Sequence, residues 1–570
     1  MIGDAHSPGD MPATIHAGET VTLSGVVNKI GEIIVNEGEL TIVDGTTLYC
    51  RGLYNTEGGV LIMGTPESPA TAINIILDAK TIAADDPWQW FPGVVNAGHW
   101  VANGAVPIDQ VYPLPDLGQR PIRKNTDHRR INAITADPDE WQITTESGRV
   151  IRAGDCPLNR GVTINGGHAA NVHHASYQID NICFRNSNGT TIALPDDTRV
   201  FEDGTVYVGK NQRGRYAFHN HHVHDASDST ITNCVVDGAK KWGFVMHDSP
   251  NSIFENCLAW NVEGAGFVRE GSLGENLQML NCIAIGSTGP MDKAGASPNS
   301  RGGARQFRMT NGLTTVDGGW FGDGFWVDHA LELELRDCGA IGCRYYGINE
   351  NGYYRNGPSV YGPAPRTGLF AESCFGGYWS TWSQTMSGER QKAYLARTVE
   401  FSSNRCPIGI EAWHDARITF VGTLRADPLV SKQSEWVSNG ARQTIGFAMS
   451  PSYETGGMIL NLNITGFNAG VLLGKNTNQL LGGTTAGIRV IGQFSNDIEI
   501  LGADSRYGDT HMVDIDSIND HRPGCERVPN APALLHLRAE TEHKKDTPVR
   551  LNGTVYTLTA TSGDIVVKSL

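Results

Sequence analysis

Short apolar runs alternate with turn-forming residues along most of the 570-residue chain. Valine, isoleucine and threonine gather in these runs, and glycine, asparagine and aspartate separate them. Branched apolar residues between turn formers predict strands, whereas long stretches with the 3.6-residue period of a helix are scarce. Glycine makes up 68 of the 570 residues, well above the ordinary usage of about 7%. We therefore expect an all-β protein with many tight turns.

The middle of the chain contains a repeat. The stretches TNCVVDGAKKWGFVMHD (232–248), ENCLAWNVEGAGFVREG (255–271) and RDCGAIGCRYYGINENG (336–352) share one pattern. Each has Asn or Asp, then cysteine and, nine positions later, glycine followed by an apolar residue. Cys234 and Cys257 are 23 positions apart. A repeat of this length, built from strands and turns, predicts a right-handed parallel β-helix with about 23 residues per coil.

One copy of the repeat is interrupted. After Cys282 the next glycine–phenylalanine pair begins at Gly324, which is 33 positions later than the repeat requires. The extra residues, roughly 287–320, are rich in Gly, Ser, Asn and Arg, as loops are. We therefore expect an insertion in one otherwise regular coil, next to the strand that leads to Asp328, where it would wall or cover the outer face.

Equivalent positions in stacked coils form rows, with about 4.8 Å from one coil to the next. Asn233, Asn256 and Asn281 are expected at a turn, where their side chains satisfy backbone groups. Seven cysteines are interpreted as an inward row of small apolar side chains rather than as disulfides or metal ligands. They are Cys183, Cys234, Cys257, Cys282, Cys338, Cys374 and Cys406.

The repeat does not extend over the whole chain. We expect an N-terminal β segment at residues 1–85, a β-helix with its insertion at residues 86–510, and a C-terminal β segment at residues 511–570 that caps the end of the helix.

One row of polar residues is a candidate for chemistry. Four positions after the repeat glycine the copies have His247, Glu270 and Asp328, and an alignment of RYAFH on GFVMH adds His219 to this row. Strand alternation places the row on the outer face, because the apolar residue after each glycine points inward. His221 lies two residues beyond His219 and shares its face, whereas His222 and His224 are expected on the other face.

Several reactions are compatible with this row. Glu270 and Asp328, one coil apart, would be separated by about 5 Å, the spacing of the carboxylate pair in retaining glycosidases. Their repulsion would raise one of the two pKa values, as an acid catalyst requires. His219 and His247 could serve as a base. Alternatively, His219 and His221 would begin a site for a divalent metal ion, calcium or zinc. The structural alternative is that these residues are solvated outer positions without a further role.

Arginines and aromatic residues near the row are candidates for substrate binding. Arginine could pair with a substrate carboxylate, and aromatic faces are typical platforms for sugars. The candidates are Arg215, Arg301, Arg305, Arg308, Trp326 and Tyr346.

Charge and hydropathy limit the classes of partner. Lysine and arginine total 45 and the acidic residues total 61, which gives a formal charge of −16. No basic stripe is available to neutralise phosphates, so nucleic acid is not an expected partner. No apolar run reaches ~18 residues, so no membrane span is expected. The 11 cysteines are odd in number and sparse, which argues against a disulfide framework.

Parts of the chain resemble a known family. The stretches IHAGETVTLSG, GEIIVNEGELTIVDG and GGVLIMGTPESPATAINIILDA, within 15–79, resemble the eight-glycine domain of the cell-migration-inducing hyaluronan-binding protein, transmembrane protein 2 and fibrocystin. GRYAFHNHHVHD resembles the family's Gly-Arg-Tyr-Pro-Ile-His-Phe-His segment. The coils after it, ITNCVVDGAKKWGFVMHDSPNS and IFENCLAWNVEGAGFVREG, are similar to the family's next coils. The resemblance extends over 15–80 and 160–350.

The resemblance implies a right-handed β-helix, an extracellular setting and, for some members, depolymerisation of hyaluronan. Ala217 stands where the family has proline, and the family's Gly-Asp after the second histidine is not reproduced in register. The positions that match the family's motif are Arg215, His219, His221, His247 and Glu270.

Together these observations lead us to expect a secreted enzyme, extracellular or periplasmic, that degrades a polysaccharide bound along the outer groove. A glycoside hydrolase acting on a hyaluronan-like or uronate-containing chain is the first hypothesis. A polysaccharide lyase on the same face and a non-catalytic, glycan-binding or adhesive β-helix are the alternatives. A divalent metal ion, calcium or zinc, is the expected cofactor if the histidines bind one.

Overall fold

The computed structural model consists of strands and turns, and no helix occurs in the ranges that it describes. These ranges are 13–29, 31–77, 92–105, 142–144, 150–152, 158–187, 190–191, 199–200, 206–207, 214–271, 276–288, 306–308, 314–316, 322–328, 333–353, 364–372, 374–383, 397–413, 418–425 and the strands β40 to β51 given below. The chain divides into two compact units. The first comprises Met1–Leu117, Asp127–Trp326 and Cys343–Tyr345, and the second comprises Gly118–Thr126, Val327–Gly342 and Tyr346–Leu570.

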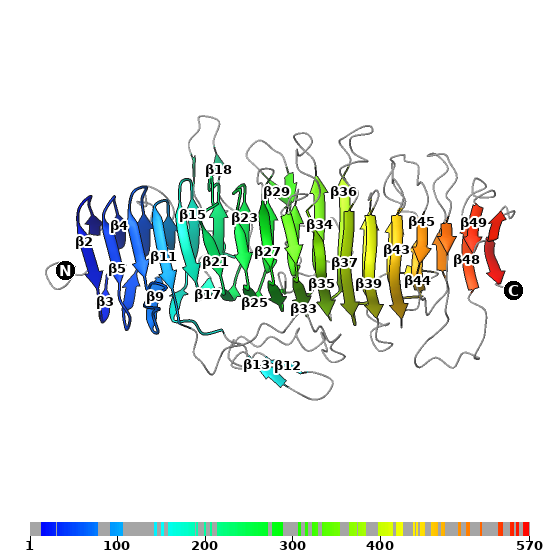
Figure 1. Ribbon diagram of the computed structural model, residues 1–570, viewed down its shortest axis with the longest axis horizontal. Helices are drawn as coiled ribbons and strands as arrows, with labels where there is room; N and C mark the ends of the chain where they lie inside the picture. The colour runs from blue at the N-terminus through cyan, green and yellow to red at the C-terminus, as the bar shows by residue number, and fades with distance from the viewer. Residues whose placement is uncertain are drawn as a thin grey trace. The chain divides into compact units, whose positions relative to one another are not determined.

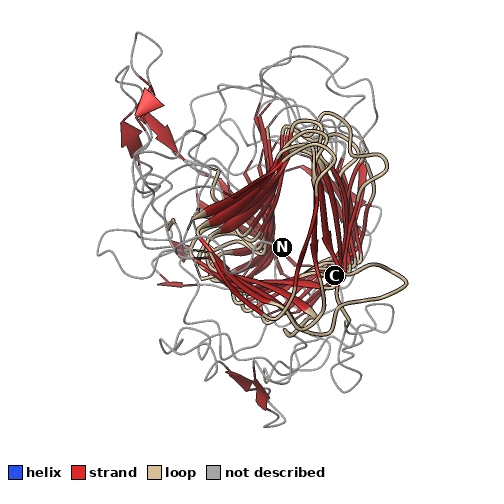
Figure 2. Ribbon diagram, turned by 90° about the vertical axis from the view of Figure 1, so that its left-hand side faces the viewer, coloured by secondary structure: helices blue, strands red, loops and turns tan. Residues whose placement is uncertain are grey.

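The first unit is built from three ladders of parallel strands, and each coil contributes one strand to each ladder (Figure 1). The first ladder, here called the site ladder, consists of β1 (Ala13–Ile15), β4 (Glu32–Val35), β7 (Gly52–Asn55), β10 (Gly93–Asn96), β15 (His168–Val172), β20 (Phe218–His221), β23 (Phe244–His247), β26 (Phe267–Glu270) and β31 (Phe325–Asp328). Figure 2 is viewed from the side of the N-terminal coils and shows the strands of the first unit arranged around the interior.

The other two ladders complete each coil of the first unit. The second ladder consists of β2 (Thr20–Leu23), β5 (Glu39–Ile42), β8 (Val60–Met63), β11 (His99–Asn103), β16 (Ser176–Asp180), β21 (Thr230–Thr232), β24 (Ile253–Glu255) and β27 (Leu277–Leu280). The third consists of β3 (Val26–Asn28), β6 (Thr47–Cys50), β9 (Ile73–Leu77), β14 (Val162–Asn165), β17 (Ile182–Ser187), β22 (Val235–Ala239), β25 (Leu258–Val262) and β28 (Ile283–Ile285).

The second unit is built from two ladders of parallel strands, several of which are eight residues long. One ladder consists of β34 (Tyr346–Tyr353), β36 (Gly376–Ser383), β38 (Ile408–Trp413), β42 (Ile445–Ser450), β44 (Ala469–Leu473), β46 (Ile498–Leu501) and β48 (Leu534–Ala539). In the other, β32 (Leu333–Arg336) and β33 (Gly339–Ile341) both pair with β35 (Arg366–Glu372), which is followed by β37 (Arg397–Asn404), β39 (Ile418–Arg425), β43 (Met458–Thr465), β45 (Ile488–Ile491), β47 (Val513–Ile515) and β49 (Pro548–Leu551).

Antiparallel pairs occur where the chain leaves the coils and at its C-terminal end. Outside the ladders, β12 (Gln142–Thr144) pairs with β13 (Val150–Arg152), β18 (Arg199–Val200) with β19 (Val206–Tyr207), β29 (Gln306–Arg308) with β30 (Thr314–Val316), and β40 (Val437–Ser438) with β41 (Ala441–Arg442). At the end of the chain, β48 pairs with β51 (Gly563–Lys568) and β49 with β50 (Thr554–Thr557). The expected insertion therefore contains the pair β29–β30, and the expected C-terminal cap contains β50 and β51.

The expected all-β, right-handed parallel β-helix is confirmed. Successive site strands such as β23 and β26 begin 23 residues apart, at Phe244 and Phe267. The N-terminal segment joins the same ladders, because β7 pairs with β10 and β9 pairs with β14 in parallel register. None of the segments that the structure describes is a helix long and apolar enough to cross a membrane.

Aromatic stacking inside the first unit explains why glycine–phenylalanine recurs. Phe244, Phe267 and Phe325 are fully buried, and consecutive rings stack at centroid distances of 5.2 and 4.8 Å. Burying each ring contributes about 1.5–3 kcal/mol. The preceding Gly243 leaves room for the next coil, because a Cβ there would lie 2.4 Å from the carbonyl oxygen of Gly266. A larger residue at this corner would push adjacent coils apart.

The buried cysteine row and the turn position of the asparagines are confirmed, but the asparagine side chains donate to other side chains rather than to backbone groups. All seven cysteines of the predicted row are fully buried as free thiols. Asn233, Asn256 and Asn281 have left-handed backbone conformations, with φ of 54°, 53° and 51°. The side-chain amide of Asn281 donates to that of Asn256 at 2.6 Å. Asparagine tolerates the left-handed region better than most residues, which accounts for its recurrence at this turn.

A second interior row was not predicted. The side-chain amides of Asn55, Asn96, Asn171 and Asn220 form a chain of hydrogen bonds of 2.8, 3.0 and 3.0 Å between consecutive coils. All four residues are fully buried. Asn96 and Asn220 also donate to the carbonyl oxygen of Ser176 and to the hydroxyl of Tyr177. Each amide is therefore hydrogen-bonded across coils, and the row aligns the site strands with one another.

Candidate metal centre

Three adjacent strands of the site ladder bring histidines and a carboxylate into one outward row. In parallel register, His221 at the end of β20 pairs with His247 at the end of β23, and His247 pairs with Glu270 at the end of β26. All three residues are partly exposed. The inward neighbours Phe218, Phe244 and Phe267 fix the alternation that turns the row toward the outside.

The register differs by two residues from the repeat alignment. That alignment placed His219 level with His247, but Phe218 pairs with Phe244, so His219 lies level with Val245. The reason is the core: Phe218 is fully buried beside Phe244. Ala217 therefore takes the place of the repeat glycine. His219 and His221 do share the outer face, as expected, with His221 and not His219 in the row of His247.

A backbone contact fixes the tautomer of His219. Its side chain is 1% exposed, and its Nδ1 lies 3.1 Å from the carbonyl oxygen of Gly214, so this nitrogen carries the proton and donates it. Tyr216 packs edge-on against the ring at 4.9 Å. Nε2 then has the lone pair and has no hydrogen-bond partner although it is buried. Metal-binding histidines commonly donate their second nitrogen to a carbonyl in this way.

The three histidines converge on one point. Nδ1 of His221 lies 3.1 Å from Nδ1 of His247, and the rings of His219 and His247 are nearly parallel, with centroids 5.8 Å apart and an interplanar angle of 4°. One nitrogen from each of His219, His221 and His247 lies within 4.8 Å of the other two. This spacing matches three ligands of one ion, whose metal–nitrogen distances would be about 2.0–2.1 Å for zinc.

Electrostatics keep this cluster neutral. Burial, followed by the charges of His221 and His247, holds the pKa of His219 well below its usual value. Burial lowers the pKa of His221 to about 3, with further contributions from His247, His222 and Arg215. Burial also lowers the pKa of His247 to about 4, against the opposing charge of Asp248. Neutral imidazoles have the free lone pairs that a metal ion requires.

Two carboxylates flank His247. Oδ2 of Asp248 lies 3.6 Å from its Nε2, and Oε2 of Glu270 lies 4.0 Å from its Nδ1. Gly271 makes room for the aspartate, because a Cβ on this glycine would lie 2.2 Å from Oδ1 of Asp248. The glutamate side chain is 28% exposed, so Glu270 is open to a molecule arriving from solvent.

His222 belongs to the cluster, contrary to the expectation that it faces away. Strand β20 ends at His221, and His222 has a left-handed backbone conformation with φ of 51°. Its ring lies 4.4 Å from that of His221 and 4.7 Å from that of His247. Strand alternation stops at the strand end, so it did not apply to His222. His224 instead packs against His174 and His173, at 4.7 and 6.3 Å.

The remaining site candidates have different outcomes. Arg215 is half-buried just before β20, and its charge contributes, after burial, to the lowered pKa of His221. Asp328 is the last residue of β31 and Arg308 the last of β29, but their side chains lie outside the described part of the chain. Arg301 and Arg305 also lie outside the described residues.

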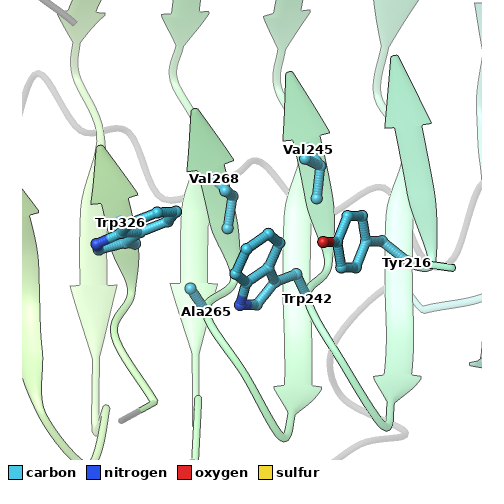
Figure 3. Packing of buried hydrophobic residues seen from close by; sticks show 6 residues of the cluster. All are labelled: Tyr216, Trp242, Val245, Ala265, Val268 and Trp326. Atoms are coloured by element: carbon cyan, nitrogen blue, oxygen red, sulfur yellow. The ribbon is translucent and has the colours of Figure 1, made fainter. Parts of the chain in front are cut away.

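Neither Trp326 nor Tyr346 presents an open aromatic face. Trp326 is 5% exposed and packs at 5.4 Å against Trp242, in a cluster that lines the outer side of successive strands (Figure 3). Tyr346, in the second unit, is 2% exposed, packs at a tilt against Trp379 and donates its hydroxyl to Glu411. The expectation of sugar platforms at these two positions is therefore wrong, because an outward position on a strand does not imply exposure.

The donor set itself indicates the class of ion. Three imidazole nitrogens suit zinc and similar transition metals, whereas calcium prefers oxygen ligands. Nε2 of His219 is buried without a hydrogen-bond partner and so has a lone pair that suits metal ligation. Of the two ions considered from the sequence, zinc fits His219, His221 and His247 better.

Comparison with known proteins supports the fold. A family model described as right handed beta helix region matches residues 160–357, a range that contains the whole histidine cluster and Glu270. A search of curated proteins finds no match to the chain. Regions of this type occur in polysaccharide-degrading enzymes and in other proteins. Residues 160–357 are thus a right-handed β-helix region by sequence match as well as by strand pairing.

Proposed function

We propose that this chain is a secreted, metal-dependent enzyme that degrades a polysaccharide by hydrolysis. The observation that carries the proposal is the convergence of His219, His221 and His247 within 4.8 Å, beside the partly exposed carboxylate of Glu270. A neutral three-histidine set with an adjacent acid is typical of catalytic rather than structural metal sites, because it leaves ligand positions open.

Each residue has a separate role in this proposal. Nε2 of His219 and one nitrogen each from His221 and His247 would hold the ion, and a zinc-type ion so bound would lower the pKa of a coordinated water. Glu270, whose Oε2 lies 4.0 Å from Nδ1 of His247, would take a proton from the attacking water and deliver it to the oxygen of the leaving sugar. Gly214 holds His219 in the required tautomer through its carbonyl oxygen.

The proposed substrate is a long glycan that lies across the coils. The outer row presents equivalent positions every ~4.8 Å along the helix, which suits a polymer more than a compact molecule. Arg215 supplies a positive charge beside the cluster and would pair with a sugar carboxylate, which favours a uronate-containing chain. The resemblance to hyaluronan-depolymerising proteins points to the same class. The expected setting is extracellular or periplasmic.

The test is a panel of neutral and uronate-containing polysaccharides, each incubated with and without a chelator. New reducing ends without absorbance from unsaturated products support a hydrolase. New reducing ends together with absorbance from unsaturated products indicate a lyase. Binding of a polysaccharide without either product indicates a glycan-binding protein. Each of these two results would contradict the proposal. Glu270→Gln should lower the rate by about 10²-fold or more. Glu255→Gln is the matched control, because Glu255 also ends a strand but is exposed on the second ladder.

A further inference from the structure

A second group of metal-binding side chains overlaps the first. His222, His247 and Asp248 each offer a ligand atom, and these atoms lie within 4.8 Å of one another. The two groups share only His247. They are here called the inner set (His219, His221 and His247) and the rim set (His222, His247 and Asp248).

The two sets meet on different nitrogens of the shared ring. Nδ1 of His247 lies 3.1 Å from Nδ1 of His221, whereas Nε2 of His247 lies 3.6 Å from Oδ2 of Asp248. A neutral imidazole has one nitrogen with a free lone pair and one that carries a proton. His247 therefore ligates either to the inner set through Nδ1 or to the rim set through Nε2, and the two sets are alternatives.

Exposure decreases from the rim set to the inner set. His222 is exposed, the side chains of His247 and Asp248 are 23% and 13% exposed, and His219 is 1% exposed. The imidazole rings from exposed His222 to buried His219 lie next to one another. The centroid distance is 4.7 Å from His222 to His247, 4.9 Å from His247 to His221 and 4.7 Å from His221 to His219. The ligands thus form a continuous series from solvent to a buried nitrogen.

The two sets also differ in charge. The inner set consists of three imidazoles, whereas the rim set contains the carboxylate of Asp248. Together with Glu270, whose side chain is 28% exposed, the carboxylate of Asp248, 13% exposed, attracts a hydrated cation before it has lost its water. Once Nδ1 of His247 has bound the ion, its Nε2–H faces the same carboxylate, at 3.6 Å, and the aspartate then orients a metal-binding histidine.

We propose that the rim set is an entry position for a divalent transition-metal ion, which binds there first and then passes to the inner set as His247 changes its ligating nitrogen. This inference rests on the metal centre of the proposed function and adds a route by which that centre is filled. Because the rim position lies on the route in both directions, it governs the rates of loading and release but not the equilibrium affinity of the inner set.

The test uses the full-length, metal-stripped protein and Co²⁺, whose visible absorbance reports ligation. Binding is followed by rapid mixing, release by adding excess chelator, and affinity and stoichiometry by equilibrium dialysis. In His222→Asn, which keeps a residue that tolerates the left-handed backbone, both rates should fall by the same factor, about tenfold. The dissociation constant and the stoichiometry of one ion per chain should be unchanged. His224→Asn is the matched control, because His224 is exposed nearby but packs on His173 and His174.

Several results would overturn the inference and still leave the centre in place. They are unchanged rates in His222→Asn, a loss of affinity in this variant as large as in His221→Ala, and two ions bound per chain at saturation. A wild-type protein that binds no Co²⁺ would instead overturn the metal centre of the proposed function. His219→Ala separates these cases, because it should abolish tight binding only if the inner set is the final site.

Discussion

His221 and His247 lie directly opposite each other on neighbouring strands, and their Nδ1 atoms are 3.1 Å apart. Two imidazoles at this distance share either a proton or a cation. The backbone pairing of β20 with β23 sets the separation, so it does not depend on a flexible loop. A site positioned by regular strands is preorganised, and little ordering is needed when an ion binds.

Zinc should bind to the metal-stripped protein, and calcium should not, because nitrogen ligands favour the softer ion. Equilibrium dialysis followed by metal analysis measures both. His221→Ala should lower zinc affinity by at least about tenfold. His16→Ala should leave it unchanged, because His16 is exposed on the first coil. Calcium binding at the same stoichiometry as zinc would contradict the histidine assignment.

Gly271→Ala should disturb the cluster through Asp248. The new Cβ would lie 2.2 Å from the carboxylate, and the residue has a φ of +96°. We expect a loss of about 1–2 kcal/mol in the free energy of unfolding from the backbone, together with slower Co²⁺ loading. Gly45→Ala provides the control, because Gly45 has a φ of +77° and open space around its Cβ position. It should lose similar stability and load Co²⁺ at the wild-type rate. Equal loading rates in the two variants would exclude a role for Asp248.

Asn171→Ala should destabilise the fold from within. It removes the acceptor for Asn96 and the donor for Asn220, both fully buried. Each unsatisfied group costs about 1–3 kcal/mol, which denaturant unfolding would measure. Asn74→Ala, at an exposed position of strand β9, should change stability by less than about 0.5 kcal/mol. Similar effects of the two substitutions would mean that the amide row contributes nothing.

Cys183, in the cysteine row, should be unreactive in the folded protein. Burial raises the pKa of Cys183 from 9.0 to about 12, so the thiol stays protonated and covered at pH 8. Iodoacetamide should label it only after unfolding. Since the unfolded state loses this proton near pH 9 and the folded state near pH 12, stability should fall as pH rises between these values. Cys183→Ala should reduce that fall, and rapid labelling of native protein at pH 8 would contradict the burial.

The fold was predictable because residues of the same type occupy equivalent positions in successive coils and pack against one another. Stacked Phe244 and Phe267, and the cysteine before each of them, leave a constant spacing in the sequence. The amide row left no such trace. Its members are separated by 41, 75 and 49 positions, so no constant spacing marks them in the sequence.

The residues of the candidate site could be predicted from the sequence, but the register and the face of some of them could not. The repeat alignment gave His219 the wrong register because Ala217, rather than glycine, precedes the stacked Phe218. It gave His222 the wrong face because a left-handed residue ends the strand alternation. Trp326 is a further example, since it lies on the outer face and is nevertheless covered.

The interior asparagines have a consequence for how this surface can change. Asn171 and Asn220 align their strands from the side opposite to the histidines, through hydrogen bonds that no surface ligand contacts. Outward residues can therefore be exchanged while the coils keep their alignment. Descendants of one β-helix could acquire a new set of ligands, or lose the present one, and still fold in the same way.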